Sequence, residues 1–411
     1  MSNTILNPSI IAQETLMQLD NEYNMTQNVF RGYEKEWMEK SNGWKKGATI
    51  TAKAPIYFRV KDGETIDTVD LREEDISLVV ENRKHIAYKF TGTEMSLTIE
   101  EFSDRFIKPV VTTFNDHITT TLLGLYKYIP NQVGTPGTTP SELYTLGEAS
   151  AVMTDHSVPK ENRYCYLDPW ATIKIADQMK GLLNAQSGKA VTKGSFGNLL
   201  GFNMYDTQDI NTHTCGTIAG VTDVLVDDTG VGEGDTTITV DQNGTLTKVF
   251  TQGDIFTVAN VYGVNTINGN STGRLRQFVC EAASSSTGND DAIECTPGTA
   301  PWNIYSASAT EKTLPYQTVD ALPVNNAAVS IAGSASLQHK VNLAFHKDAL
   351  ALFMVPVHAP SELKSYRKSG NGFTITVTIG GDIINYVSYI RFDILYGVKA
   401  INPFLACRIA G

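Results

Sequence analysis

Residues 98–129 read TIEEFSDRFIKPVVTTFNDHITTTLLGLYKYI, and this stretch predicts one long helix around which the rest of the chain is organised. Apolar side chains recur at every fourth residue, at Phe102, Phe106, Val110, Phe114, Ile118, Leu122 and Tyr126. A step of four overshoots the helical turn of about 3.6 residues, so the apolar stripe winds slowly around the helix. At about 1.5 Å per residue the helix is about 45 Å long, which a compact enzyme domain seldom needs.

The ends and the interior of this helix carry separate signals. Thr98 and Glu101 have the spacing of a capping box, in which a hydroxyl and a carboxylate satisfy free N–H groups. Pro109 removes one backbone hydrogen bond and clashes with the carbonyl four residues earlier, so we expect a kink there. Pro130 ends the helix, and the Gly- and Pro-containing residues 133–140 form a loop.

The composition is that of a globular protein. The chain has 411 residues, of which 41% are hydrophobic and 19% charged, enough for two or three domains. It has no run of about eighteen apolar residues, and its N-terminal sequence lacks a secretory pattern, so we expect no membrane span and no signal peptide. The formal net charge of −11 argues against tight binding of nucleic acid, because phosphate neutralisation needs a basic surface. It does not exclude a protein that encloses nucleic acid.

Residues 1–43 carry too little apolar surface to form a core of their own. We therefore expect an N-terminal arm that lies on another surface, of the same chain or of a neighbour. Within it, residues 10–19 have the spacing of a short amphipathic helix, with Ser9 as a candidate N-cap.

Residues 44–95 predict a two-stranded finger. Residues 49–60 alternate between apolar and polar side chains, the sequence KDGE at 61–64 turns the chain, and Ile76 begins a return strand. An isolated hairpin is marginally stable in water, so we expect the finger to rest on another subunit. The candidate contact residues are polar or turn-forming residues on either side of the tip: Lys61, Asp62, Gly63, Glu64, Arg72, Glu73 and Glu74.

The chain after the long helix changes character twice. Residues 131–211 are mixed, with helical spacing that includes 168–183, where Asp168 and Pro169 predict the N-cap and first position. Residues 212–316 are rich in Gly, Thr, Asp, Asn and Ser and contain short alternating segments, which predict a small inserted β barrel or sandwich. The mixed pattern then resumes: FTITVTI at 373–379 predicts an exposed strand, and we expect the C-terminal segment to join a main sheet.

Two motifs resemble chemical sites but favour structural explanations. Gly269-Asn-Ser-Thr-Gly273 matches the nucleophile elbow, yet turn residues precede it and a strand follows, which favours a hairpin turn. His339, His346 and His358 fit neither a zinc-protease nor a zinc-finger spacing, so packed or surface histidines are favoured.

Other polar groups also lack a catalytic pattern. The adjacent pairs Glu100/Glu101 and Glu73/Glu74 cannot face each other across a cleft. There is no P-loop and no C-x-x-C, and the five cysteines predict reduced, buried residues, although a Cys280–Cys295 bridge stays open. A carboxylate-rich stretch does not match an EF-hand and favours a solvated loop: Asp223, Asp227, Asp228, Glu233, Asp235 and Asp241. We therefore predict no catalytic residue, no cofactor and no metal site.

The order of these features resembles the major capsid (coat) proteins of tailed double-stranded DNA bacteriophages, and among them the P22 coat-protein family. The resemblance covers nearly the whole chain. It rests on residues 47–63 as the E-loop, 100–110 as the start of the spine helix, 201–216 as the start of the inserted domain, 253–265 with 273–279 as its core hairpin, and 395–398 as the last strand and turn.

The resemblance implies an α+β protein with the Hong Kong 97-type capsid fold and an inserted small β-barrel I-domain. Its parts would be an N-terminal arm at 1–43, the E-loop with flanking P-domain strands at 44–95, the P-domain spine helix at 96–130, a first A-domain part at 131–211, the I-domain at 212–316, and a second A-domain part with C-terminal P-domain strands at 317–411.

The resemblance also implies a function. The protein would be a major capsid protein, not an enzyme, that assembles into pentamers and hexamers of an icosahedral head enclosing double-stranded DNA without specific binding. Its partners would be other copies of itself, a scaffolding protein and a portal, and no membrane. It would be made and assembled in the host bacterial cytoplasm and reside in the virion capsid. Maturation would flex the spine helix, and we place that flexure at Pro109.

Two other classes of protein fit the sequence less well. A β-rich phage adhesin or spike would use residues 212–316 as its ligand domain, but it should carry a trimeric stalk or repeats, which this sequence lacks. A hydrolase would need a coherent catalytic set, and none is visible.

Overall fold

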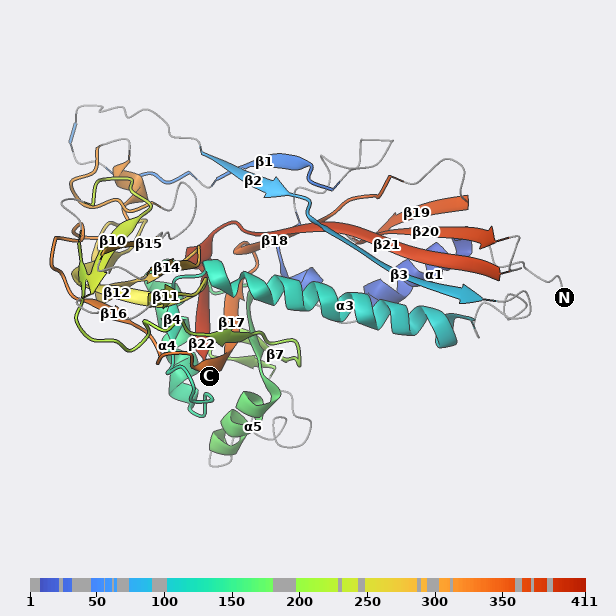
Figure 1. The fold of residues 1–411 in the computed structure, drawn as a ribbon, viewed down its shortest axis with the longest axis horizontal. Helices are drawn as coiled ribbons and strands as arrows, with labels where there is room; N and C mark the ends of the chain where they lie inside the picture. Colours follow the sequence, from blue (N-terminus) through green and yellow to red (C-terminus); the bar gives the residue numbers. More distant parts are fainter. Residues whose placement is uncertain are drawn as a thin grey trace. The chain divides into compact units, whose positions relative to one another are not determined.

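The computed structural model describes residues 8–21, 25–31, 46–54, 56–60, 63–64, 74–90, 102–179, 197–227, 231–242, 248–286, 290–293, 303–310, 313–358, 364–370, 373–382 and 387–411. The chain forms two compact units and passes between them several times. The first comprises Met1–Ala52, Ser77–Leu122 and Ala351–Lys399, and the second Lys53–Ile76, Leu123–Leu350 and Ala400–Gly411. Helices and strands occur together in both units, which confirms the predicted α+β class (Figure 1).

The long helix is present where the four-residue pattern predicts it. A π-helical turn, η4 (Ser103–Ile107), leads into the α-helix α3 (Lys108–Leu123) and then the 3-10 turn η5 (Gly124–Tyr128). The apolar stripe is buried except at Phe106, which is half-buried and stacks on Tyr88 with ring centroids 5.4 Å apart. Burial of the stripe explains why a sequence rich in β-branched threonines stays helical here.

Pro109 is the second residue of α3, directly after a change in backbone hydrogen bonding. The N–H of Lys108 donates to the carbonyl of Ser103, five residues earlier, instead of four. Such a π turn is a known cause of helix irregularity, and it lies where the proline removes the next donor. The predicted capping pair Thr98 and Glu101 lies outside the described residues.

The first unit holds a five-stranded sheet made of β3 (Asn82–Phe90), β18 (Leu350–Met354), β19 (Lys364–Gly370), β20 (Phe373–Asp382) and β21 (Val387–Ala400). The strand order is β18-β21-β20-β19, and β3 also pairs with β21. In Figure 1, β19, β20 and β21 lie side by side, as their hydrogen-bonded order requires. The expectation of an exposed strand at 373–379 is wrong, because Phe373, Ile375 and Val377 and the threonines between them are buried.

The arm packs on this unit over its described residues. The helix α1 (Pro8–Asn21) packs against β19 and β20, and the Ser103 hydroxyl donates to Glu14 at 3.0 Å. The 3-10 turn η1 (Met25–Asn28) follows, and Phe30 forms a bridge with Ala351. Ser9 lies inside α1, so it is not the N-cap: the helix begins at Pro8, whose fixed φ suits a first turn.

The second unit is built on a seven-stranded sheet of β4 (Gln132–Val133), β5 (Arg163–Leu167), β6 (Asn198–Leu199), β7 (Phe202–Asp206), β8 (Thr212–Thr214), β17 (Gln338–His346) and β22 (Ala406–Ala410). The order is β4-β22-β17-β5-β7-β6, with β8 paired to β17. The C-terminal strand β22 therefore lies inside a main sheet, as predicted.

Two helices accompany this sheet. The helix α4 (Leu143–Asp155) packs against β22 and β4. The helix α5 (Pro169–Gln178) starts at the predicted cap: the Asp168 carboxylate accepts a hydrogen bond from the N–H of Trp170 at 3.2 Å.

The Gly- and Thr-rich segment folds into short strands: β9 (Val224–Val226), β10 (Ile238–Gln242), β11 (Lys248–Phe250), β12 (Ile255–Val264), β13 (Ser271–Val279), β14 (Ser284–Ser286) and β15 (Asp290–Ile293), joined by β16 (Val329–Ile331). They form the sheets β15-β10-β9, β11-β14 and β13-β12-β16. One hydrophobic core spans Cys215 to Cys280 and also takes in Val319 and Ile331. The boundaries 212–316 of an inserted domain stay a prediction.

The finger has a short paired base. β1 (Thr49–Lys53) pairs with β2 (Asp75–Val79), and the Ala54 N–H donates to the carbonyl of Glu74 at 2.9 Å. Beyond β1, residues 56–60 continue without strand pairing, so the alternating pattern of 49–60 gives a ladder over its first part only. The 3-10 turns η7 (Leu314–Tyr316) and η8 (Pro403–Leu405) lie elsewhere in the second unit.

Candidate functional site

The predicted contact residues of the finger are described in part. Gly63 and Glu64 are exposed, and Glu74 is half-buried with its carbonyl in the base of the finger. Lys53 and Asp75 form an ion pair of 2.9 Å at the end of the paired region. The remaining candidates, Lys61, Asp62, Arg72 and Glu73, lie outside the described residues, so their role stays a prediction.

The finger carries an apolar stripe that the sequence interpretation did not single out. Ile56, Phe58 and Val60 are 39%, 72% and 98% exposed. Residues two apart in an extended chain point to the same side, so these three side chains share one side of the limb. We call Ile56, Phe58 and Val60 the finger stripe.

The alternate residues of the limb are anchored to the second unit. The Asn402 side-chain amide donates to the Tyr57 hydroxyl at 3.1 Å, and the Tyr57 ring meets the Tyr316 ring edge-on at 5.7 Å between centroids. Arg59 donates through Nη2 to Gln317 Oε1 at 2.9 Å. Burial raises the pKa of Tyr57. These contacts turn one side of the limb inward and leave the finger stripe facing solvent.

A second apolar surface lies on α5. Trp170 and Ile173 are 72% and 61% exposed and lie three residues apart, so they share one helical face. Exposed tryptophan is enriched among the residues that dominate protein interfaces. The opposite face of α5 is buried through Ala171 and Ile175.

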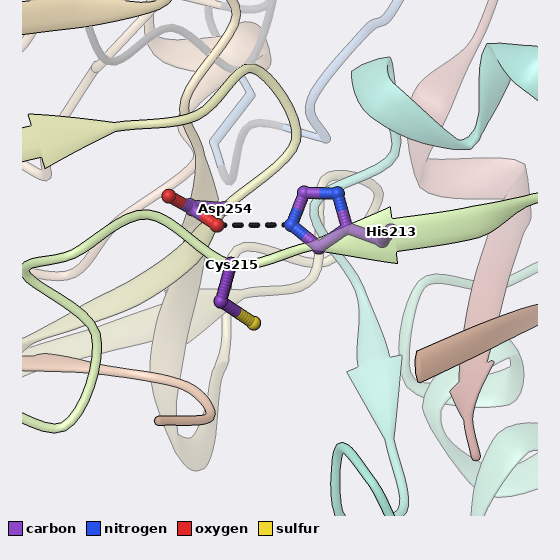
Figure 2. Close-up of side chains that lie close together, drawn as sticks. All are labelled: His213, Cys215 and Asp254. Carbon is purple, nitrogen blue, oxygen red and sulfur yellow. Dashed lines mark hydrogen bonds and ion pairs between the residues drawn. The ribbon is translucent and has the colours of Figure 1, made fainter. Parts of the chain in front are cut away.

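The second unit also contains a buried polar cluster of His213, Cys215 and Asp254. Figure 2 shows the His213 ring directed at the Asp254 carboxylate, with Nε2 and Oδ1 2.9 Å apart. All three side chains are at most 3% exposed. His213 lies on β8, where the chain approaches the short-strand segment, and Asp254 lies just before β12.

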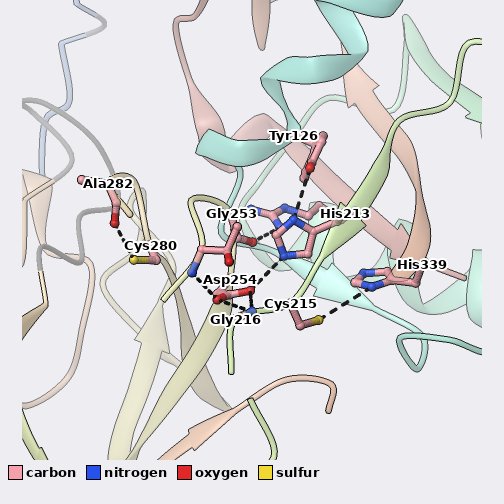
Figure 3. Close-up of polar contacts among 11 residues, drawn as sticks. Tyr126, His213, Cys215, Gly216, Gly253, Asp254, Cys280, Ala282 and His339 are labelled. Carbon is pink, nitrogen blue, oxygen red and sulfur yellow. Dashed lines mark hydrogen bonds and ion pairs between the residues drawn. The ribbon is translucent and has the colours of Figure 1, made fainter. Parts of the chain in front are cut away.

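Neighbouring elements complete this cluster, as Figure 3 shows. His213 Nδ1 lies 3.2 Å from the Tyr126 hydroxyl, and the N–H of Gly216 donates to Asp254 at 3.1 Å. Cys215 Sγ lies 3.8 Å from His339 Nδ1. The cluster therefore joins the end of the long helix, strands β8 and β17, and the start of β12.

Arg408 of β22 brings a positive charge to the same region. Its Nη1 donates to the carbonyl of Gly253 at 2.6 Å, and its guanidinium lies 5.3 Å from the Tyr126 ring centroid. Burial lowers the pKa of Arg408 to about 9, while Tyr126 and Asp254 oppose that shift. Asp254 thus supplies the negative charge that a buried guanidinium requires.

The cluster has the residue types of a metal site but the geometry of a hydrogen-bond network. His, Cys and Asp are ligands for zinc, and their ligand atoms lie within 4.8 Å of one another. Here, however, His213 and Asp254 bond directly to each other. Burial and the Asp254 charge raise the pKa of Cys215 to about 11, which keeps the thiol protonated. We therefore interpret the cluster as structural.

The motifs weighed from sequence occupy structural positions. Gly269 lies in the turn between β12 and β13 and Ser271 begins β13, which confirms the hairpin explanation. His339 and His346 are buried on β17 and His358 is exposed, so the three do not converge. In the acidic stretch, the Asp235 carboxylate accepts from the N–H of Gly232, while Asp228 lies outside the described residues.

The cysteine prediction is confirmed for the described thiols. Cys165, Cys215 and Cys407 are buried and reduced, and the Cys280 thiol donates to the carbonyl of Ala282 at 3.0 Å. Cys295 lies outside the described residues. In the described part of the chain, no helix is long and apolar enough to cross a membrane.

Sequence reasoning missed the polar cluster because its members are far apart in the chain. His213 and Cys215 are two residues apart, but Asp254 follows 41 residues after His213 and His339 lies 124 residues after Cys215. The finger stripe had a usable signal in the sequence, namely three apolar residues that alternate with Tyr57 and Arg59.

Comparison with known proteins identifies the family. The family model for the P22 coat protein (gene protein 5) matches residues 7–409. The major capsid protein of Acyrthosiphon pisum secondary endosymbiont phage 1 is 23% identical over 394 residues, and the match covers 89% of this chain and 89% of that protein. The solved capsid of Ralstonia phage GP4 aligns at 8% identity and a TM-score of 0.45, covering 94% of this chain and 88% of that one. A structure from Mycobacterium phage Che8 aligns at 12% identity and a TM-score of 0.44, covering 95% and 90%.

The family match spans both units, from the start of the helix α1 into the C-terminal strand β22. This chain therefore belongs to the P22 coat-protein family and is a phage major capsid protein.

Proposed function

We propose that this coat protein assembles with copies of itself into pentamers and hexamers that close into an icosahedral head. The observation that carries the proposal is the finger stripe: Ile56, Phe58 and Val60 face solvent because Tyr57 and Arg59 hold the other side of the limb. An apolar stripe presented on an anchored limb favours a protein partner. In a shell of identical subunits that partner is a second copy.

The shell is stabilised by many contacts of this kind. A finger that binds a different surface of its neighbour makes a heterologous contact, and such contacts close into rings. Trp170 and Ile173 on α5 offer a second surface, and the polar tip from Lys61 to Glu64 would border the first. Each contact can be weak, because several act together in a closed shell.

The finer features of the head follow from the same proposal. Residues 212–316 would form the I-domain, and residues 1–43 would add arm contacts. The net charge of −11 suits a wall that encloses double-stranded DNA without binding it. A scaffolding protein and a portal would take part in assembly in the host bacterial cytoplasm. The role is structural and not catalytic, and the family match does not favour an adhesin or spike.

The proposed hinge of the spine helix is Pro109. The π turn η4 ends at Ile107, two residues before Pro109, so the backbone close to the proline departs from regular α-helical hydrogen bonding. Helix curvature measured by cryo-electron microscopy should differ between the precursor and mature shells at Pro109. A bend that is the same in both shells contradicts this assignment.

The assembly proposal is tested by negative-stain electron microscopy of the purified chain, with light scattering beside it. Hollow isometric shells are expected, either from the chain alone or after addition of a cognate scaffolding protein. A chain that stays monomeric with that scaffolding protein present overturns the proposal.

A further inference from the structure

A cavity of about 250 Å³ in the second unit is lined in part by the buried guanidinium of Arg276. It lies where the end of α4 and strand β4 meet the β12–β13 hairpin. The charged or titratable residues on its wall are Glu148, Asp155, His156, Arg274 and Arg276. It is distinct from the finger and from the polar cluster of His213, Cys215 and Asp254.

Arg276 is 3% exposed, yet no carboxylate of the described residues is hydrogen-bonded to its Nε or Nη2. Its Nε and Nη2 are enclosed and have no hydrogen-bond partner among the described residues. The guanidinium instead stacks on the Phe404 ring, 4.4 Å from the centroid. Aromatic contact offsets only part of the cost of enclosing a charge, which otherwise requires a carboxylate or phosphate partner.

Several polar groups of the wall have partners of their own. The Arg274 guanidinium lies 4.0 Å from the Asp155 carboxylate. Gln132 and Gln277 exchange two hydrogen bonds of 2.7 and 2.9 Å. Among the described residues, no carboxylate of the wall is hydrogen-bonded to Nε or Nη2 of Arg276.

His156 adds a second open position beside Arg276. Its ring lies 5.4 Å from the Phe404 ring, and its Nδ1 is enclosed without a hydrogen-bond partner in the described part of the chain. Phe404 thus contacts both Arg276 and His156. Nε and Nη2 of Arg276 and Nδ1 of His156 can therefore bind a hydrogen-bonding ligand in one region of the wall.

We propose that this cavity binds a carboxylate, with the Arg276 guanidinium as its principal partner. A guanidinium presents a planar fork of N–H donors that matches a carboxylate, and the cavity has room for one. A single charge is favoured over a phosphate dianion, because Glu148 and Asp155 on the same wall repel a second negative group. The carboxylate comes from a free small acid or from a side chain of a second copy.

The test is thermal unfolding of the unassembled full-length chain in sodium acetate and in sodium chloride, at equal ionic strength and pH 7. Acetate is expected to raise the unfolding midpoint of the unmodified chain by about 2 °C more than it raises that of Arg276→Met. Comparison with Arg276→Met removes the general effect of exchanging chloride for acetate. Equal responses of the two chains overturn the proposal.

Two further variants keep the test decisive if Arg276→Met folds poorly. Arg276→Lys keeps the charge without the planar fork and should lose at least half of the acetate response. Arg105→Met is the matched control, since Arg105 is an exposed arginine of η4 outside the cavity wall, and it should keep the full response. A response lost in Arg105→Met and kept in Arg276→Lys contradicts the role of Arg276.

The assembled shell distinguishes the two sources of the carboxylate. Shells that keep the acetate response have a cavity open to a free small acid. Shells that lose it, while unassembled chains show it, have a carboxylate of a second copy in the cavity. With sodium phosphate at the same ionic strength, the difference between the unmodified chain and Arg276→Met should be smaller than with acetate, and a larger difference contradicts the assigned ligand class.

Discussion

His156 is enclosed beside Arg276, and its surroundings determine its charge. Burial and the neighbouring guanidinium lower the pKa of His156 to about 3. The imidazole of an unfolded chain has a pKa of about 6.5, so between these values the unfolded state binds one more proton than the folded state. The contribution of His156 to stability is therefore full above about pH 6.5 and is lost progressively as the pH falls towards 3. Burial likewise lowers the pKa of His339, to about 4, and adds to the same trend.

We expect His156→Gln to weaken this pH dependence, because glutamine does not titrate. Urea unfolding at several pH values from 7 to 4 measures it: the free energy of unfolding of the variant should fall less steeply with decreasing pH. His85→Gln is the control, since His85 lies exposed on β3, and it should leave the slope unchanged. An unchanged slope in His156→Gln means that other groups carry the acid sensitivity.

Asp254 is a buried carboxylate of the polar cluster in the second unit. It accepts hydrogen bonds from His213 and from the N–H groups of Gly216 and Thr251, and it balances the charge of buried Arg408. Asp254→Asn removes that charge and turns an amide donor towards other donors. We expect a loss of about 3–5 kcal/mol in the free energy of unfolding. Asp348→Asn, at a half-exposed carboxylate, should cost under about 0.5 kcal/mol in the same urea titration. Similar losses of unfolding free energy in the two variants would show that the hydrogen bonds and charge of Asp254 do not stabilise the second unit.

At the scale of elements, the β12–β13 turn and the finger limb are in close contact. Gly269 has φ +75°, and a Cβ built there would overlap the Arg59 guanidinium. Gly273 has a similar φ of +69° but no atom within 4 Å of such a Cβ. Comparing alanine substitutions at the two glycines therefore distinguishes the effect of backbone strain from the effect of displacing the finger.

We expect Gly269→Ala and Gly273→Ala each to cost about 1 kcal/mol of stability through the positive φ. Only Gly269→Ala should also displace Arg59 from Gln317 and loosen residues 56–60. Amide hydrogen exchange of those residues reports the difference, with faster exchange in Gly269→Ala alone. Equal exchange in both variants shows that Arg59 does not anchor the limb.

Elements with strong local signals were predictable, and their irregularities were not. The four-residue stripe identified the long helix and its buried face, and Asp168-Pro169 identified the start of α5. The π turn before Pro109 depends on backbone accommodation that no residue pattern encodes. The strand β20 was misread because alternating threonines indicate an exposed face, whereas Thr374 and Thr376 are 4% and 1% exposed. The hydroxyl of Thr374 meets that of Ser369 on β19 at 3.0 Å, a contact that a single strand does not reveal.

At the scale of the whole molecule, the order of elements indicated the family, while the polar sites depended on tertiary contacts. The succession of arm, finger, long helix and Gly/Thr-rich insertion is a property of the sequence and could be predicted from it. The His213–Asp254 pair and the cavity at Arg276 join residues that only the fold brings together. Arg276 in particular looks like an ordinary solvent-facing residue of an alternating strand, because nothing in the sequence places Phe404 beside it.

Assembly of a closed shell should depend steeply on protein concentration, because each subunit gains its full set of contacts only in the completed shell. Contacts made by the finger stripe should determine the protein concentration at which assembly begins. Val60 is 98% exposed in the unassembled chain, so Val60→Ser should leave the free energy of unfolding within about 0.5 kcal/mol. If Val60 is buried between copies, losing its apolar contact should cost about 1–2 kcal/mol per subunit and raise the assembly threshold by about tenfold. Val324→Ser removes the same side chain at a position that is 65% exposed and outside the finger, and it should leave the threshold unchanged. Light scattering measured against protein concentration gives the assembly threshold of each variant. If Val324→Ser raises the threshold as much as Val60→Ser does, the finger stripe has no special part in assembly.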